Sequence, residues 1–211
     1  MQISRRNLVL GDGALFGVAG TALALKLAPT SGQDLGPFYP IVRPKDEDAD
    51  LTRLRGAKGV ARGEPINVIG RVVDPRGRPV RGARLELWQA NAVGRYDHPG
   101  DVRDDAALDP NFQGYASLAT DRDGHFKFRT IKPGAYKIPG DMRTPHIHFD
   151  IHGRTERLVT QLYFPGEPLN EKDLILRTAA PRESVIAQAI ARLSTDPGAA
   201  AFNWTVVLAY G

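Results

Sequence analysis

Cysteine is absent from the 211-residue chain. Its absence excludes disulfide bonds, thiolate metal sites, iron–sulfur clusters and a cysteine nucleophile. Any metal ion must therefore be held by His, Tyr, Asp or Glu side chains. A basic stripe is also absent, because 28 Lys and Arg residues nearly balance 24 Asp and Glu residues and both signs are mixed along the chain. We therefore expect no nucleic-acid partner.

Long hydrophobic runs are scarce, and the best candidate lies near the N-terminus. Residues 9–25 are rich in Gly, Ala and Leu, but Asp12 interrupts them, so we expect no stable membrane span. Because Arg5 and Arg6 precede this stretch, it resembles a twin-arginine export signal. We assign residues 1–29 to a signal or anchor and expect an exported, periplasmic protein. Without a working signal the protein would be cytoplasmic, and the sequence leaves cleavage of the signal open.

The rest of the composition predicts one folded domain that is rich in turns. Hydrophobic residues make up 42% of the chain, enough to bury a core, and 22 Gly with 16 Pro favour short strands over long helices. Residues 30–64 show no sustained apolar period and include the acidic run from Asp46 to Asp50, so we expect an extended arm. Residues 65–211 then form the folded domain.

Apolar periodicity predicts an all-β fold. Segments of β-branched or alternating residues, bounded by turn signals, predict about seven short strands. The clearest are residues 66–73, 85–88, 125–129, 146–151, 158–164 and 202–208. Arg182 to Leu193 is the one predicted helix, because its apolar residues recur at helical spacing. We therefore expect a β-sandwich of short mixed or antiparallel strands, with one short helix near the C-terminus.

Two histidines stand two residues apart in one predicted strand. Side chains at positions i and i+2 share a face of a strand, so His146 and His148 present neighbouring imidazoles, which suits a first-row metal ion. His152 has the same parity, so a copper or zinc site built from histidines alone remains open.

Two tyrosines, Tyr96 and Tyr136, each follow a strand-and-turn unit. A phenol with a pKa near 10 is a poor ligand for a divalent ion at neutral pH, whereas Fe(III) is hard enough to displace its proton. Two Tyr and two His without Cys would therefore select Fe(III). On periodicity alone, a role as a core or rim aromatic remains open for each tyrosine.

Linked motifs follow one another with the order and spacing of a known family. They comprise Ile69–Asp74, Leu85–Asn91 with Gly94-Arg95-Tyr96, Leu108–Phe112, Phe128–Tyr136, Arg143–Phe149 and Thr160–Phe164. Through them residues 66–211 resemble the intradiol ring-cleavage dioxygenases, and more closely the protocatechuate 3,4-dioxygenase (beta-chain) type than the catechol type. The resemblance implies an enzyme that cleaves a catechol-type ring between its two hydroxylated carbons with dioxygen. The product would be a muconate-type dicarboxylate.

The resemblance also implies roles for individual residues. Tyr96, Tyr136, His146 and His148 would ligate a non-haem Fe(III), with Tyr136 and His146 in the axial positions. Tyr136 would also act as a base for one substrate proton. Arg143 matches an arginine that lies over the substrate ring, and Gln161 matches a glutamine behind the ligands.

Two departures from the family pattern touch the substrate pocket. Many relatives have Trp at the position of Ile138, and the segment between Tyr136 and Arg143 is short, so the identity of the catechol stays open. The sequence also leaves open whether the protein forms a homo-oligomer or pairs with a homologous chain. The alternative function is that of a non-catalytic, transthyretin-like sandwich that binds or carries a ligand. That alternative gives no reason for two Tyr and two His in one motif set.

Overall fold

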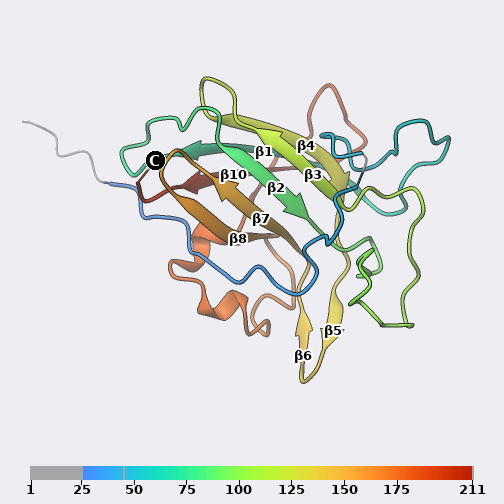
Figure 1. The fold of residues 1–211 in the computed structure, drawn as a ribbon. Coiled ribbons are helices and arrows are strands. Elements are labelled where there is room, and N and C mark those ends of the chain that lie inside the picture. The colour runs from blue at the N-terminus through green and yellow to red at the C-terminus, as the bar shows by residue number, and fades with distance from the viewer. Residues whose placement is uncertain (1–25, 45, 211) are drawn as a thin grey trace, which may run out of the picture.

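The computed structural model describes residues 26–44 and 46–210 (Figure 1). The predicted export signal, including Arg5 and Arg6, lies outside these residues apart from its last few positions. Within the described part of the chain, no helix has the length and apolar character needed to cross a membrane.

Two four-stranded sheets make up the body of the protein, which confirms the predicted β-sandwich (Figure 1). The first sheet has the order β4-β1-β10-β9, and its β1–β10 pair is parallel while the other pairs are antiparallel. The second sheet is antiparallel and has the order β3-β2-β7-β8. The strands of the first sheet are β1 (Pro65–Val73), β4 (His125–Ile131), β9 (Gln188–Ile190) and β10 (Ala200–Val207). Those of the second are β2 (Arg84–Trp88), β3 (Tyr115–Ala119), β7 (His146–His152) and β8 (Arg157–Tyr163).

A small hairpin extends from one end of the sandwich. It consists of β5 (Tyr136–Ile138) and β6 (Asp141–Arg143), and Tyr136 is the register partner of Arg143 (Figure 1). The connection from β8 to β9 carries two short 3-10 helices, η1 (Leu176–Thr178) and η2 (Arg182–Val185).

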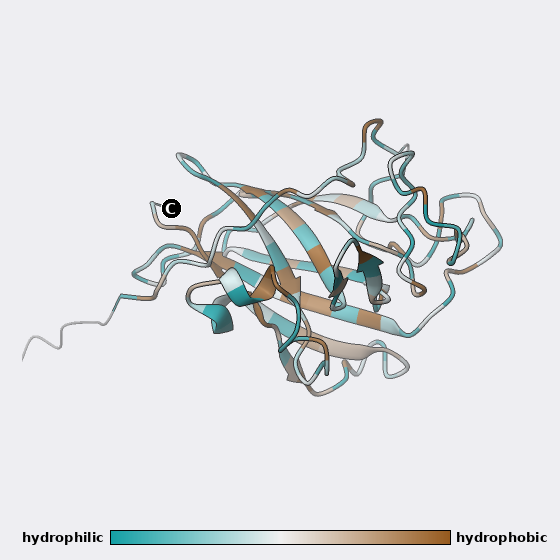
Figure 2. Cartoon of the chain, turned by 90° about the horizontal axis from the view of Figure 1, so that it is seen from below, coloured by the Kyte–Doolittle hydropathy of each residue, from teal (hydrophilic) through white to brown (hydrophobic). Residues whose placement is uncertain are grey.

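The hydrophobic core lies between the two sheets. Along β4 the buried residues Phe126 and Phe128 alternate with exposed ones, and the strands in Figure 2 show the same alternation of brown and teal. Phe149 of the second sheet packs against Phe128 and against Trp204 of the first. Burying each such aromatic side chain stabilises the fold by about 1.5–3 kcal/mol. The core therefore occupies the inner faces and leaves the outer face of the second sheet for other contacts.

The predicted helix over Arg182–Leu193 is wrong. Only η2 is helical, and the chain then extends so that β9 pairs with the edge of β10. The N–H of Ala187 donates to the carbonyl of Tyr163 at 2.9 Å, which holds this segment against β8. Helical spacing of apolar residues is a local signal, and the unpaired edges of two sheets override it by offering backbone hydrogen bonds.

The N-terminal arm lacks named strands but is fixed to both sheets. The N–H of Thr30 donates to Val207 of β10 at 3.0 Å, and the N–H of Gln33 donates to Val159 of β8 at 2.8 Å. Further along, Leu51 is fully buried in the core. The arm thus crosses from the first sheet to the outer face of the second, where the two strand histidines lie.

Candidate metal centre

Four of the predicted site residues meet at one end of the outer face of the second sheet. His146 and His148 come from β7, Tyr136 from the start of β5, and Tyr96 from the loop between β2 and β3. The Nε2 atoms of the two histidines are 3.2 Å apart, and the Oη of Tyr136 lies 3.4 Å from Nε2 of His146. The ring of Tyr96 is perpendicular to that of Tyr136, with centroids 5.6 Å apart. All four side chains are buried.

A glycine allows the two tyrosine-bearing segments to approach each other. Gly94 has φ of 80°, and a Cβ there would lie 2.5 Å from the carbonyl oxygen of Ala135. Any larger residue would push the Tyr96 loop away from Tyr136, so the Gly94-Arg95-Tyr96 motif has a steric basis.

Both histidines are held in the neutral state. Burial lowers the pKa of His146 and of His148 well below the usual value, and the charge of Arg143 acts in the same direction. Nδ1 of His146 lies 2.6 Å from the carbonyl oxygen of Thr144. A carbonyl can only accept, so Nδ1 carries the proton and Nε2 keeps its lone pair. That lone pair faces His148 and Tyr136, as a metal-ligating histidine requires.

The two phenols are buried, and one of them has no hydrogen-bond partner. Burial raises the pKa of Tyr96 and of Tyr136, and the nearby charges of Arg143 and Arg103 oppose this shift. The Oη of Tyr96 is inaccessible to solvent and unpaired. Leaving a buried hydroxyl unsatisfied costs about 1–3 kcal/mol, and a cation bound between the four side chains would remove that cost. The donor set therefore fits a metal ion that prefers imidazole nitrogen and phenolate oxygen.

His152 does not join His146 and His148 in a three-histidine site. His152 lies at the far end of β7 and faces Asp150, with Nε2 3.0 Å from Oδ1. Among the described residues no group of three or more His, Cys, Asp or Glu side chains could hold a metal ion. The further side chains that meet His146 and His148 are those of Tyr136 and Tyr96.

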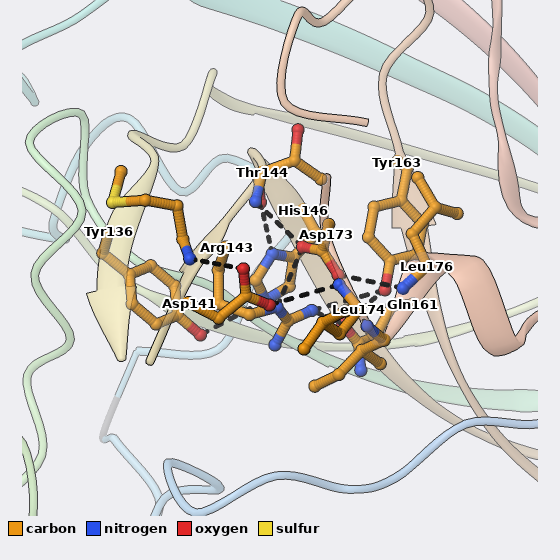
Figure 3. A network of polar contacts seen from close by, with 12 residues as sticks. Tyr136, Asp141, Arg143, Thr144, His146, Gln161, Tyr163, Asp173, Leu174 and Leu176 are labelled. Carbon is orange, nitrogen blue, oxygen red and sulfur yellow. Dashed lines mark hydrogen bonds and ion pairs between the residues drawn. The ribbon is translucent and has the colours of Figure 1, made fainter. Parts of the chain in front are cut away.

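Arg143 lies beside the four side chains in a network of buried polar contacts. Its Nε donates to Oδ2 of Asp173 at 2.9 Å, and its Nη2 donates to Oε1 of Gln161 at 2.6 Å. The hydroxyl of Tyr163 donates to the same Gln161 oxygen at 3.0 Å. Figure 3 shows this network, in which Arg143 contacts both Asp173 and Gln161, and its charge contributes to the lowered pKa of His146. The structure thus places Arg143 against Gln161, the register partner of His148, while the roles expected of both residues stay predictions.

Asp173 and Tyr163 also belong to the site, although no pattern in the sequence predicts them. Tyr163 is part of the Thr160–Phe164 motif, but nothing in the sequence predicts that its hydroxyl contacts Arg143. Asp173 lies in the loop before η1, where its Oδ1 accepts the N–H groups of Ile175 and Leu176. An Asp in that position indicates an ordinary turn or cap. No spacing in the sequence connects it with an arginine 30 residues earlier.

The arm and β2 cover the remaining sides of the cluster. Trp88 stacks on His148, with centroids 5.0 Å apart and planes at 10°. Phe38 stacks on Tyr96 at 4.7 Å, and a Cβ on Gly36 would lie 3.0 Å from the His148 ring. Leu35 and Ile138 add partly buried apolar surface beside the tyrosines. The walls around the four side chains are therefore mostly aromatic and aliphatic.

Comparison with known proteins agrees with this architecture. A family model described as "Dioxygenase" matches residues 35–210. The protocatechuate 3,4-dioxygenase beta chain of Burkholderia cepacia is 42% identical over 189 residues, which cover 86% of this chain and 76% of that protein. A hydroxyquinol 1,2-dioxygenase of Rhizobium sp. (strain MTP-10005) is 30% identical over 168 residues, 72% of this chain and 52% of that protein. The chain thus spans about half the length of that second relative.

Solved structures show the same fold. The dioxygenase domain of a dioxygenase carbohydrate-binding protein fusion from Streptomyces sp. SirexAA-E superposes with a TM-score of 0.65 at 29% identity, covering 86% of this chain and 99% of that one. A β-sandwich with this cluster on its outer face, matched over most of its length by such relatives, defines a dioxygenase fold. The chain belongs to the intradiol ring-cleavage dioxygenase family, a class of oxidoreductases.

Proposed function

We propose that the protein is a non-haem Fe(III) intradiol dioxygenase. It would cleave a catechol-type ring between its two hydroxylated carbons with dioxygen and give a muconate-type dicarboxylate. The observation that carries this proposal is the convergence of two neutral imidazoles with two buried phenols, one of which has an unpaired hydroxyl. A hard trivalent ion suits this donor set, because it can displace the phenol protons that burial otherwise retains.

Tyr96, Tyr136, His146 and His148 would hold the iron. Bound Fe(III) would draw electron density from a deprotonated catechol and so open the ring to attack by dioxygen. Tyr136 supports this chemistry through its Oη, which can accept a proton from an incoming catechol hydroxyl. The Thr144 carbonyl keeps His146 in the tautomer that ligation needs. The aromatic and aliphatic walls exclude water from the reacting groups, which strengthens the electrostatic interactions there.

Arg143 would stabilise negative charge that develops on the substrate ring. Its guanidinium is buried, and its charge already acts on the pKa values of His146, His148 and both tyrosines. A cation that is already oriented toward developing charge accelerates such a reaction by about 10²–10³-fold. Gln161 and Asp173 hold the guanidinium in one orientation, so it needs no rearrangement during the reaction.

The test is a turnover screen combined with metal analysis. We expect the purified full chain to bind iron, to be coloured, and to convert at least one of catechol, hydroxyquinol and protocatechuate to a ring-opened dicarboxylate with uptake of dioxygen. A transthyretin-like carrier would bind a ligand without iron and without consuming oxygen. Absence of iron, or unaltered catechols after incubation with iron and air, would refute the proposal.

Export and assembly are separate proposals. Arg5 and Arg6 support export by the twin-arginine route, and replacing both with Lys should retain the protein in the cytoplasm while the purified enzyme stays active. A relative named as a beta chain supports pairing with a homologous chain, and a homo-oligomer is the alternative. The molecular mass of the purified protein, alone and after co-expression with a homologous neighbour, distinguishes the two.

A further inference from the structure

Asp173 is a fully buried carboxylate that ties three parts of the site together. Its Oδ2 accepts Nε of Arg143 and the N–H of Thr144, each at 2.9 Å. Its Oδ1 accepts two N–H groups from the first turn of η1. Because the Thr144 carbonyl in turn accepts Nδ1–H of His146, one carboxylate holds both the cation of the site and the residue whose carbonyl orients His146 (Figure 3).

Asp173 also neutralises Arg143. The two side chains are 0% and 4% exposed, so solvent screens their charges little. The next cation near the tyrosines, Arg103, is also paired, since Asp101 accepts its guanidinium and Asp105 lies close enough to raise the pKa of Arg103. Arg95 shares Asp101 at 3.6 Å. Asp101 thus serves two arginines, and Nε and Nη1 of Arg95 are buried without a hydrogen-bond partner among the described residues, whereas Arg143 has the carboxylate of Asp173 to itself.

Apolar side chains pack directly against the two tyrosines. Leu35, Phe38 and Ile138 supply apolar surface next to the tyrosines. At the hairpin, the carboxylate of Asp141 accepts the N–H of Leu174, which brings a further negative charge close to the loop that carries Asp173. A carboxylate on the substrate ring would lose its hydration against this apolar surface, and Asp173 reduces the compensation that the Arg143 charge can offer it.

We propose that Asp173, by pairing with Arg143, selects catechols whose ring carries no charge and disfavours carboxylated ones. This inference rests on the proposed dioxygenase function. Asp173 is a positioning and specificity-determining residue and does not itself touch the ring. The inference separates this chain from its relative named for protocatechuate, a catechol with a ring carboxylate.

The first test uses the unmodified protein and two ligands of nearly equal shape. Protocatechuate carries a carboxylate where 3,4-dihydroxybenzamide carries a neutral amide. We would titrate each into the iron-loaded full chain without oxygen and follow the visible spectrum to obtain dissociation constants. We expect the amide to bind at least about tenfold more tightly than protocatechuate. A loss of affinity of this size is typical when one charge is buried without a full counter-ion. Equal affinities, or tighter binding of protocatechuate, would overturn the inference.

The second test changes the charge balance in both directions. Asp173→Asn leaves Arg143 uncompensated and should reduce the preference for the amide by about tenfold, whereas Arg143→Gln leaves the carboxylate uncompensated and should increase it. Glu171→Gln is the matched control, because it removes a carboxylate two residues away that pairs with Arg182 at the surface, and it should leave the preference unchanged. Iron content and melting temperature identify a variant that has lost its fold.

The outcomes separate the inference from the proposed function. Unsubstituted catechol is titrated beside the two ligands: if none of the three changes the spectrum of the iron-loaded protein, the dioxygenase proposal itself fails, and if catechol alone changes it, the inference about ring charge is overturned. If both ligands bind but folded, iron-containing Asp173→Asn keeps the preference of the unmodified protein, only the role of Asp173 is refuted. If Asp173→Asn does not fold, the comparison of the two ligands on the unmodified protein, together with Arg143→Gln, decides the matter.

Discussion

The guanidinium of Arg103 lies over the ring of Tyr136, with its central carbon 4.5 Å from the ring centroid. Asp101 and the carbonyl of Gly94 hold this guanidinium in place, and Asp101 also accepts the N–H of Tyr96. A single ion pair thus supports both tyrosine-bearing segments. Cation–π contacts of this kind contribute about 0.5–2 kcal/mol, depending on how far they are desolvated.

Replacing Arg103 with Met should change the colour of the iron-loaded protein. The positive charge lowers the energy of the electrons on Tyr136, so its removal makes transfer of charge from the phenolate to iron easier. We expect the visible band to move to longer wavelength, with some loss of iron. Arg122→Met is the control, because Arg122 is exposed and far from the site. An unchanged spectrum in Arg103→Met would show that Arg103 does not influence Tyr136.

Tyr96→Phe and Tyr136→Phe should have different effects on iron binding and turnover. We expect Tyr96→Phe to retain less iron, because its unpaired buried hydroxyl depends most on a bound cation. Tyr136→Phe should retain more iron but turn over slowly, because the substrate loses the base at Tyr136 Oη. Metal analysis and visible spectra of both variants check this. Spectra identical to that of the unmodified protein in both variants would mean that neither tyrosine binds iron.

Arg143→Ala should keep its iron, but its kcat should fall by about 10²–10³-fold. This is the usual effect of removing a cation that is directed at developing charge. The variant should also melt at a lower temperature, because a buried ion pair loses one partner. Rates should therefore be measured well below the melting temperature. Arg182→Ala, which breaks an ion pair with exposed Glu171, serves as the control and should turn over normally. Normal turnover in Arg143→Ala would exclude a role in the reaction.

The metal-free protein should lose stability as the pH falls below about 6.5. Burial depresses the pKa of His146 and of His148 in the folded state, so the unfolded chain binds their protons first. The stability that these histidines contribute is complete above their unfolded pKa. It decreases below that pH by about 1.4 kcal/mol per pH unit for each histidine. Urea denaturation between pH 7.5 and 5.5 measures this slope.

His146→Gln should remove about half of that pH dependence. A slope that is the same in this variant and in the unmodified protein would show that the histidines take up protons freely in the folded state.

Deleting residues 1–29 should leave fold and activity intact, whereas deleting residues 1–33 should destabilise the protein. The longer deletion removes the N–H and hydroxyl contacts of Thr30 with Val207, the contacts of Ser31 with Ser184 and Ala180, and the Gln33–Val159 bond. Each hydrogen bond contributes about 0.5–1.5 kcal/mol. Thermal melting of the two truncated proteins checks the difference. Equal melting temperatures would show that the arm does not stabilise the sandwich.

Much of the site follows from local patterns in the sequence. The two-residue period of a strand places His146 beside His148 whatever the rest of the fold does. The absence of cysteine restricts any metal site to other side chains, and the spacing of the motifs adds Tyr96 and Tyr136. Alternation of apolar residues likewise predicts β4 and β7, because each of these strands has one face on the core.

Tertiary structure alone decided the features that depend on residues far apart in the chain. The segment after Arg182 has helical spacing but extends to β9, because the edge of β10 offers hydrogen bonds that no local pattern encodes. Glu86 lies on the outer face of β2, opposite to the core residues Leu85 and Leu87, and is buried there only because the arm brings Tyr39 and Arg43 to it. Asp173 reaches Arg143 only through the path of the loop after β8. A period in the sequence reports which face a residue occupies, whereas the partner that it meets there depends on how distant segments pack.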